Sequence, residues 1–128
     1  MSKIVLDASV LLAIIYREPG WERMRPELLA RAAVSSVNLA EVQGKLMTDG
    51  WSSDEAWEDA TSAVAEICPF TPAQAKIAGS LITQTRTVGL SLGDRACLAL
   101  AIELKAPAYT ADRLWKTLSL GVRIHPIR

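Results

Sequence analysis

Four acidic residues occupy positions in this sequence where a carboxylate could do chemistry. Two follow short apolar stretches and two lie at the starts of helical segments; they are Asp7, Glu41, Asp94 and Asp112. Carboxylates about 5 Å apart repel by roughly 3 kcal/mol at an effective dielectric constant near 20, so a cluster of them needs a compensating cation. Oxygen ligands without neighbouring Cys or His suit Mg²⁺ or Mn²⁺ better than zinc. Such ions activate water, and the acids therefore point to metal-dependent phosphodiester hydrolysis.

A purely structural role is also open for the two helix-start acids. Asp94 lies three residues after Ser91, the spacing of a capping box, and that role alone could explain its presence. Glu41 could likewise complete a cap that begins at Asn38, because negative charge near a helix N-terminus is stabilising.

The two strand-end acids differ in how well structure alone explains them. Asp7 ends a buried-strand pattern, where a carboxylate must find partners or suffer desolvation, so a functional role is favoured. Asp112 could be a turn residue paired with Arg113. The joint placement of the four acids therefore matters more than any single position.

The segments that must position these acids alternate between strand and helix patterns. Predicted strands cover residues 4–6, 33–36, 108–110 and 122–124, with a weaker edge strand at 68–70. Predicted helices cover residues 8–16, 21–33 with a kink at Pro26, 38–49, 52–67, 71–85, 94–105 and 113–118. This alternation predicts one domain over residues 1–128, a three-layer α/β/α sandwich around a central, mainly parallel sheet of about four to five strands.

Element lengths bring the acids to one level of such a fold. A helix of about 12 residues from Asp94 runs roughly 18 Å, and a strand of about 5 residues returns roughly 17 Å to Asp112. Asp7 ends the first strand, and the helix that carries Glu41 follows the second. All four are therefore expected at the carboxyl edge of the sheet, where ligands bind if the strand order reverses there.

Composition gives a neutral chain whose charges are unevenly distributed. The net charge is zero over 128 residues, so attraction to phosphate must come from local patches. Residues 41–66 hold seven acidic side chains against one basic, whereas residues 67–128 hold eight basic against three acidic. Cys68 and Cys97 are expected to be reduced core residues. With neither a signal-peptide pattern nor an apolar run of membrane-spanning length, a cytoplasmic protein is expected.

Four segments together resemble the successive motifs of the PIN-domain ribonucleases, and among these they look most like the VapC-type toxins of toxin–antitoxin pairs. The segments are VLDAS at 5–9, SVNLAEV at 36–42, LSLGDRACLA at 90–99 and YTADRLW at 109–115. By position, Asp7, Glu41, Asp94 and Asp112 match the acidic metal-binding quartet of the family. Thr110 matches its hydroxyl position beside the last acid, and Ser9 could serve in the same way after the first.

The resemblance implies a Mg²⁺- or Mn²⁺-dependent endoribonuclease. It further implies a homodimer that a cognate antitoxin silences by placing its tail in the active site, with DNA bound only through the antitoxin complex. Basic residues that flank the motifs are candidate contacts to RNA phosphates; they are Arg86, Arg95, Arg113 and Lys116.

Two other functions remain open from the residues alone. A phosphoacceptor or metal-sensing module could use Asp7, but receiver domains need a Lys near the last strands, and Lys105 and Lys116 are poorly placed for it. A phosphatase with an Asp nucleophile usually carries a second Asp two residues later, where this chain has Ser9.

The remaining conspicuous side chains are expected to play smaller parts. The single His125 is expected to be neither catalytic nor a ligand. Tryptophans are mostly core residues, but Trp51 or Trp57, if exposed, would be a contact for an antitoxin or a second copy of the chain.

Overall fold

Five parallel strands form one sheet in the computed structural model, which describes residues 2–128. Their order is β3-β2-β1-β4-β5. The strands are β1 (Ile4–Leu6), β2 (Ala32–Ser35), β3 (Glu66–Cys68), β4 (Ala108–Thr110) and β5 (Ile124–Pro126). The chain adds β2 and β3 on one side of β1 and then β4 and β5 on the other, so the strand order reverses between β1 and β4.

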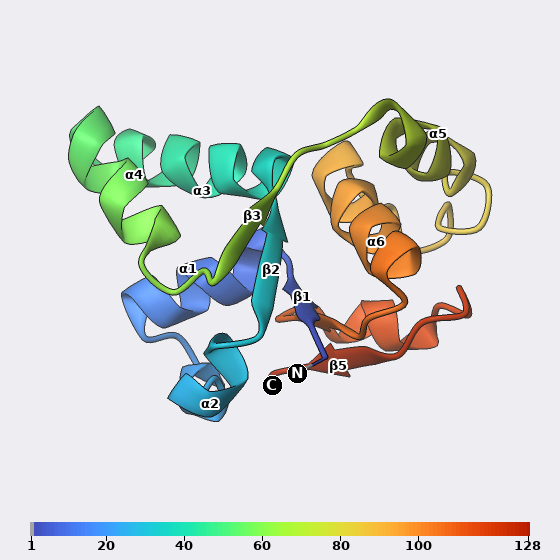
Figure 1. Cartoon of the computed structure of the whole chain (residues 1–128), viewed down its shortest axis with the longest axis horizontal. Coiled ribbons are helices and arrows are strands. Elements are labelled where there is room, and N and C mark those ends of the chain that lie inside the picture. The colour runs from blue at the N-terminus through green and yellow to red at the C-terminus, as the bar shows by residue number, and fades with distance from the viewer. Residues whose placement is uncertain (1) are drawn as a thin grey trace.

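Helices cover both faces of this sheet, which confirms the predicted α/β/α sandwich (Figure 1). One face carries α1 (Ala8–Tyr16), α3 (Ser36–Thr48) and α4 (Ser53–Thr61), and the other carries α5 (Pro72–Ser80) and α6 (Leu92–Leu104). The pleat of β1 divides its side chains between two cores: Ile4 and Leu6 pack toward α1 and α3, and Val5 packs toward α6. Among the described residues, no helix combines the length and apolarity needed to cross a bilayer.

The central strand β1 ends abruptly because its next residue starts a helix. All three residues of β1 are fully buried, as expected for a parallel strand that is covered on both faces. Asp7 is the N-cap of α1, and its side chain accepts a hydrogen bond from the Val10 backbone N–H. The acid therefore lies at the carboxyl end of β1, as predicted.

The predicted helix over residues 21–33 is wrong. The chain instead forms a 3₁₀ turn, η1 (Trp21–Arg23), and one short helix, α2 (Pro26–Leu29), before β2 begins at Ala32. Pro26 cannot donate a backbone hydrogen bond, and the residue before it, Arg25, is extended with φ −74° and ψ 157°. Proline thus separates the two short pieces instead of kinking one helix.

Several predicted boundaries also move. The helix that Ser52 caps ends at Thr61 instead of residue 67, because Ile67 pairs with β2 as part of β3. The strand β3 lies two residues earlier than the predicted 68–70. The predicted helix to residue 85 ends at Ser80, where the Ser80 hydroxyl donates to the Ile77 carbonyl and competes with helical bonding. The last strand covers Ile124–Pro126 instead of 122–124, because pairing with β4 sets its register.

Candidate active site

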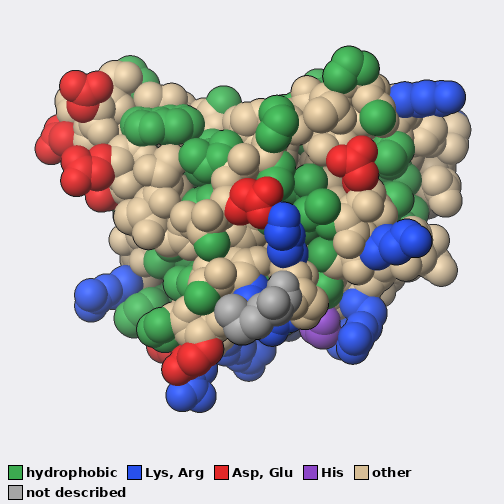
Figure 2. Space-filling view, in the orientation of Figure 1, with side chains coloured by type: hydrophobic (Ala, Val, Ile, Leu, Met, Phe, Trp, Pro, Cys, Tyr) green, Lys and Arg blue, Asp and Glu red, His purple; other side chains and the backbone are tan. Residues whose placement is uncertain are grey.

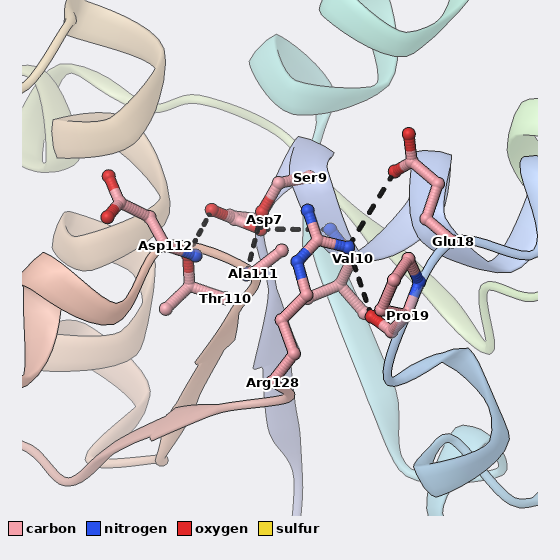
Figure 3. Close-up of polar contacts among 9 residues, drawn as sticks. All are labelled: Asp7, Ser9, Val10, Glu18, Pro19, Thr110, Ala111, Asp112 and Arg128. Atoms are coloured by element: carbon pink, nitrogen blue, oxygen red, sulfur yellow. Dashed lines mark hydrogen bonds and ion pairs between the residues drawn. The ribbon is translucent and has the colours of Figure 1, made fainter.

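Asp7 is a buried carboxylate whose hydrogen-bond donors among the described residues are all uncharged (Figure 3). It is 3% exposed. One oxygen, Oδ1, accepts hydrogen bonds from the Ser9 hydroxyl at 2.6 Å and the Val10 N–H at 3.1 Å. The other, Oδ2, accepts one from the Thr110 hydroxyl at 2.8 Å. Within residues 2–128, none of the ion pairs includes Asp7, so its negative charge has no positive partner.

Burial raises the pKa of Asp7 to about 6, against an ordinary value of 3.8. Hydrogen bonds from Ser9, Thr110 and Val10 oppose this shift in pKa but do not cancel it, and the nearby carboxylate of Asp94 adds to it. Burying the ionised form of Asp7 therefore costs free energy, and a bound cation would offset that cost.

Two hydroxyls tie Asp7 to the neighbouring strand. The Ser9 hydroxyl, besides donating to Asp7, accepts a hydrogen bond from the Ala111 N–H at 2.9 Å. The Thr110 hydroxyl accepts one from the Asp112 N–H at 3.1 Å. Both predicted hydroxyls therefore lie at the site, one on each oxygen of the first acid, and they connect β1 to the segment that follows β4.

Replacing Thr110 by valine is expected to lower the free energy of unfolding by about 1–3 kcal/mol. The valine keeps the shape of the side chain but removes a donor to Asp7 and the acceptor of the Asp112 N–H. Urea denaturation would measure the loss. The control is Thr117→Val, because Thr117 is exposed and its hydroxyl bonds only within η2 (Arg113–Thr117), so a change below about 0.5 kcal/mol is expected there. Equal stability of both variants would contradict the role given to Thr110.

Asp94 and Asp112 both cap helical segments in this structure. The Ser91 N–H donates to Asp94 Oδ2 at 3.0 Å and the Asp94 N–H donates to the Ser91 hydroxyl at 3.2 Å, so the predicted capping box at the start of α6 is confirmed. Asp112 accepts from the Leu114 N–H at 2.9 Å and caps η2. Figure 3 shows the Asp112 side chain directed away from Asp7. The alternative pairing of Asp112 with Arg113 is absent from the ion pairs of the described residues.

Glu41 does not complete a cap at Asn38, and that prediction is wrong. The N-cap of α3 is Ser35, which places Asn38 inside the first turn with 1% of its surface exposed. The Asn38 amide donates to Glu41 Oε1 at 2.9 Å and also to the Gly93 carbonyl at 3.0 Å. A side chain at Gly93 would collide with the Glu41 carboxylate. Glu41 therefore lies against the first turn of α6, in contact with Gly93, the residue that precedes Asp94.

Sequence reasoning missed the parts that Asn38 and Gly93 play in this arrangement. The available signals were an Asn three residues before Glu41 and a Gly immediately before Asp94. Both signals have ordinary local explanations, a helix cap and a flexible turn. Only the contact between α3 and α6 shows what the two residues do.

Three of the four acids raise the pKa of one buried side chain, the Cys97 thiol. The pKa of the Cys97 thiol lies well above its usual range because the thiol is fully buried and because Asp7, Asp94 and Glu41 each disfavour a second negative charge nearby. Cys97 is a free, neutral core residue, as predicted, and Cys68 is also free and buried. Asp7, Glu41 and Asp94, which belong to three different segments, are therefore all near enough to Cys97 to influence its pKa.

The donor set has the chemistry that a hard divalent cation requires. It offers carboxylate and hydroxyl oxygens, its thiol is neutral, and no Lys or Arg neutralises the four acids among the described ion pairs. In the conformation that the structure shows for residues 2–128, no three Asp, Glu, His or Cys side chains are placed so that they could hold one metal ion. Asp94 and Asp112 are each directed at a backbone N–H group at the start of their own helical segment. Sharing one ion with Asp7 would require these two side chains to rotate.

The four basic side chains predicted to contact RNA phosphates differ in their solvent exposure and in their hydrogen bonds. Arg86 and Lys116 are exposed. Arg113 is exposed too, but its Nε donates to the carbonyl of the C-terminal residue at 3.1 Å. Arg95 is half-buried, and its Nη1 donates to the Ala78 carbonyl at 2.8 Å, so this side chain joins α6 to α5.

The other conspicuous residues are an aromatic pair on neighbouring strands and two tryptophans. His125 stacks on Tyr109 of the adjacent strand with ring centroids 4.9 Å apart, and its pKa is lowered by burial and by nearby Arg123 and Lys116. Trp115 is a core residue, whereas Trp57 on α4 is 44% exposed.

Several solved structures share this fold at low sequence identity. VapBC from Salmonella typhimurium, bound to DNA, has a TM-score of 0.75 and 20% identity, with the whole of both chains covered. VapBC2 from Rickettsia felis, bound to promoter DNA, has a TM-score of 0.72 and 22% identity over 96% of this chain and 97% of that one. VapC20 from Mycobacterium tuberculosis, a toxin that cleaves the sarcin-ricin loop, has a TM-score of 0.72 and 18% identity over 94% and 99%.

The family comparison covers most of the chain. No curated protein matches the sequence. The family model described as the PIN domain matches residues 4–119, a range that contains all four acids and both hydroxyls. PIN domains generally use divalent metal ions, in keeping with the oxygen donors found here. The chain belongs to the PIN domain family.

Proposed function

We propose that this protein is a Mg²⁺- or Mn²⁺-dependent endoribonuclease and the toxin of a type II toxin–antitoxin pair. The observation that supports the proposal is that Asp7, Glu41 and Asp94 come from three segments, all raise the pKa of the buried Cys97 thiol, and have no positive partner among the described ion pairs. That edge lies where the strand order reverses, which is the ligand-binding position of open parallel sheets.

The residues that would hold the ion are Asp7, Glu41, Asp94 and Asp112. A bound divalent cation supplies charge neutralisation and a lowered pKa for water at the scissile phosphate. The chain itself contributes orientation: Ser9 and Thr110 fix one oxygen each of Asp7, so the central carboxylate cannot turn away. Asp112 is exposed and Asp94 is half-buried, and among the described residues each carboxylate accepts a hydrogen bond only from a backbone N–H group, which lets it reorient toward a ligand.

The same surroundings argue against the two other functions that the residues left open. An Asp-nucleophile phosphatase would carry a second Asp two residues after Asp7, where the Ser9 hydroxyl donates to Asp7 instead. A phosphoacceptor module would place a lysine beside Asp7. None of its hydrogen-bond donors is a lysine.

The toxin role draws support from the solved VapBC complexes of the same fold. Figure 2 shows acidic side chains gathered at the end of the molecule that α4 forms. This acidic surface and the exposed Trp57 would suit a basic segment of a cognate antitoxin, through which any DNA binding would occur. Exposed Ile82, Leu92 and Leu114 would suit a homodimer. Arg86 and Lys116 are the freest candidates for RNA phosphates, and we expect the protein to act in the cytoplasm.

The direct test is cleavage of total RNA by the purified protein with and without metal. We expect defined cuts in Mn²⁺ or Mg²⁺, loss of cutting in excess EDTA, and recovery when Mn²⁺ is restored. Induced expression in cells should arrest growth and produce the same cut sites. Cutting that persists unchanged in EDTA would rule out the metal-dependent mechanism, and absence of cutting with either ion would rule out the nuclease.

A further inference from the structure

Asn38 is a buried amide that joins two helices from opposite layers of the sandwich. It belongs to α3, which packs on one face of the sheet, and it donates to the Gly93 carbonyl of α6, which packs on the other. The same Nδ2 donates to Glu41 Oε1, so one nitrogen serves a carboxylate and a backbone carbonyl. The contact lies at the carboxyl edge of the sheet, beside Asp94.

The hydrogen-bond partners decide which way this amide points. Both are acceptors, so only the NH₂ group of Asn38 can face them. The other end, Oδ1, is buried and has no hydrogen-bond partner among residues 2–128. A buried acceptor without a partner is costly, and an apolar side chain of the same size would avoid that cost. Stability of the fold alone therefore does not explain an asparagine here.

Gly93 completes the arrangement from the side of α6. Glu41 packs so closely on its Cα that no β-carbon fits without displacing the carboxylate. As a residue within α6, Gly93 also has a helical partner for its carbonyl, so the bond from Asn38 is additional to the helix. Two residues thus confine the Glu41 carboxylate. Asn38 donates a hydrogen bond to it, and Gly93 offers a backbone surface against which it packs.

We propose that Asn38 is a positioning residue for Glu41, with Gly93 as the surface against which Glu41 is held. The two residues keep the Glu41 carboxylate beside Asp94, within reach of the cation that Asp7 needs. This inference rests on the proposed metal-dependent function. A partner of this kind that orients a ligand typically changes metal affinity by about 10- to 100-fold when it is removed.

The first experiment measures Mn²⁺ affinity by titration calorimetry and RNA cleavage as a function of Mn²⁺ concentration. Asn38→Leu and Gly93→Ala should each weaken Mn²⁺ binding by about 10- to 100-fold while the variants remain folded. The matched control is Gly44→Ala, because Gly44 lies in α3 with open space around its Cα and should bind Mn²⁺ as the wild type does. Unchanged affinity in Asn38→Leu would overturn the inference.

A double variant separates positioning from a general effect on folding. If Asn38 acts through Glu41, adding Asn38→Leu to Glu41→Gln should cause almost no further loss of Mn²⁺ affinity. Losses that multiply would show that Asn38 acts independently of Glu41 and would overturn the inference. Asn38→Thr, which retains one donor, should recover part of the affinity that Asn38→Leu loses.

Side-chain NMR distinguishes a wrong inference from a wrong function. In the wild type, the Asn38 NH₂ should exchange slowly with solvent and shift when Glu41 is changed to Gln, whether or not Mn²⁺ binds. If the wild type binds no Mn²⁺ but shows this response, the proposed function fails and the positioning holds. Fast exchange with no response to Glu41→Gln would overturn the positioning even in an active nuclease.

Discussion

Asp94→Asn is expected to lower the rate of metal-dependent RNA cleavage by about 1,000-fold in a protein that remains folded. Losing a carboxylate of the site removes several kcal/mol of transition-state stabilisation, and each 1.36 kcal/mol is a factor of ten in rate. The asparagine keeps an oxygen that can accept from the Ser91 N–H, so the start of α6 stays capped. Single-turnover cleavage of a defined RNA would measure the rate, and circular dichroism would verify the fold.

The chain contains a matched control for this substitution. Ser52 and Glu55 form the same capping box at the start of α4, in an exposed position away from the four acids. Glu55→Gln removes the same charge from the same kind of cap and should leave cleavage within about twofold of the wild type. If both variants lost activity equally, or if Asp94→Asn retained it, capping would be the sole role of Asp94.

Asp7→Asn is expected to make the protein more stable above pH 6 in the absence of divalent ions. The pKa of Asp7 is about 6 in the folded protein and near 3.8 in the unfolded chain, so the folded state binds this proton more tightly. The stability that the protonated carboxyl contributes is fully present below pH 3.8 and is lost as the pH rises through 6. A difference of about two pKa units corresponds to roughly 3 kcal/mol at most.

Urea denaturation of both proteins between pH 4 and pH 8, in EDTA, would measure this difference. The wild type should lose stability relative to Asp7→Asn across that interval, and Mn²⁺ at pH 7.5 should stabilise the wild type but not the variant. Asp7→Asn should also be inactive in RNA cleavage. If the free energy of unfolding of the two proteins changed in parallel with pH, the raised pKa of Asp7 would not be the cause of the loss of stability.

Much of the element order could be predicted because the relevant patterns are local. The fully apolar stretch of β1, the turn to helix at Asp7 and the capping boxes at Ser52 and Ser91 are set by residues within a few positions of each other. Where prediction was wrong, local signals competed. The apolar spacing of residues 21–33 predicted one helix, but Pro26 interrupts it. Asn38 has the residue type of a helix cap, but Ser35 is the N-cap of α3.

The sequence by itself determined that four acids follow strand ends and helix starts, and it predicted that they gather at one edge of a parallel sheet. Periodicity and capping encode such placements within short stretches of chain. The tertiary structure decided where each carboxylate points. Thr110 bonds to Asp7 across 103 positions and Asn38 bonds to the Gly93 carbonyl across 55, so these contacts depend on how whole elements pack. Burial, which only packing creates, is also what raises the pKa of Asp7.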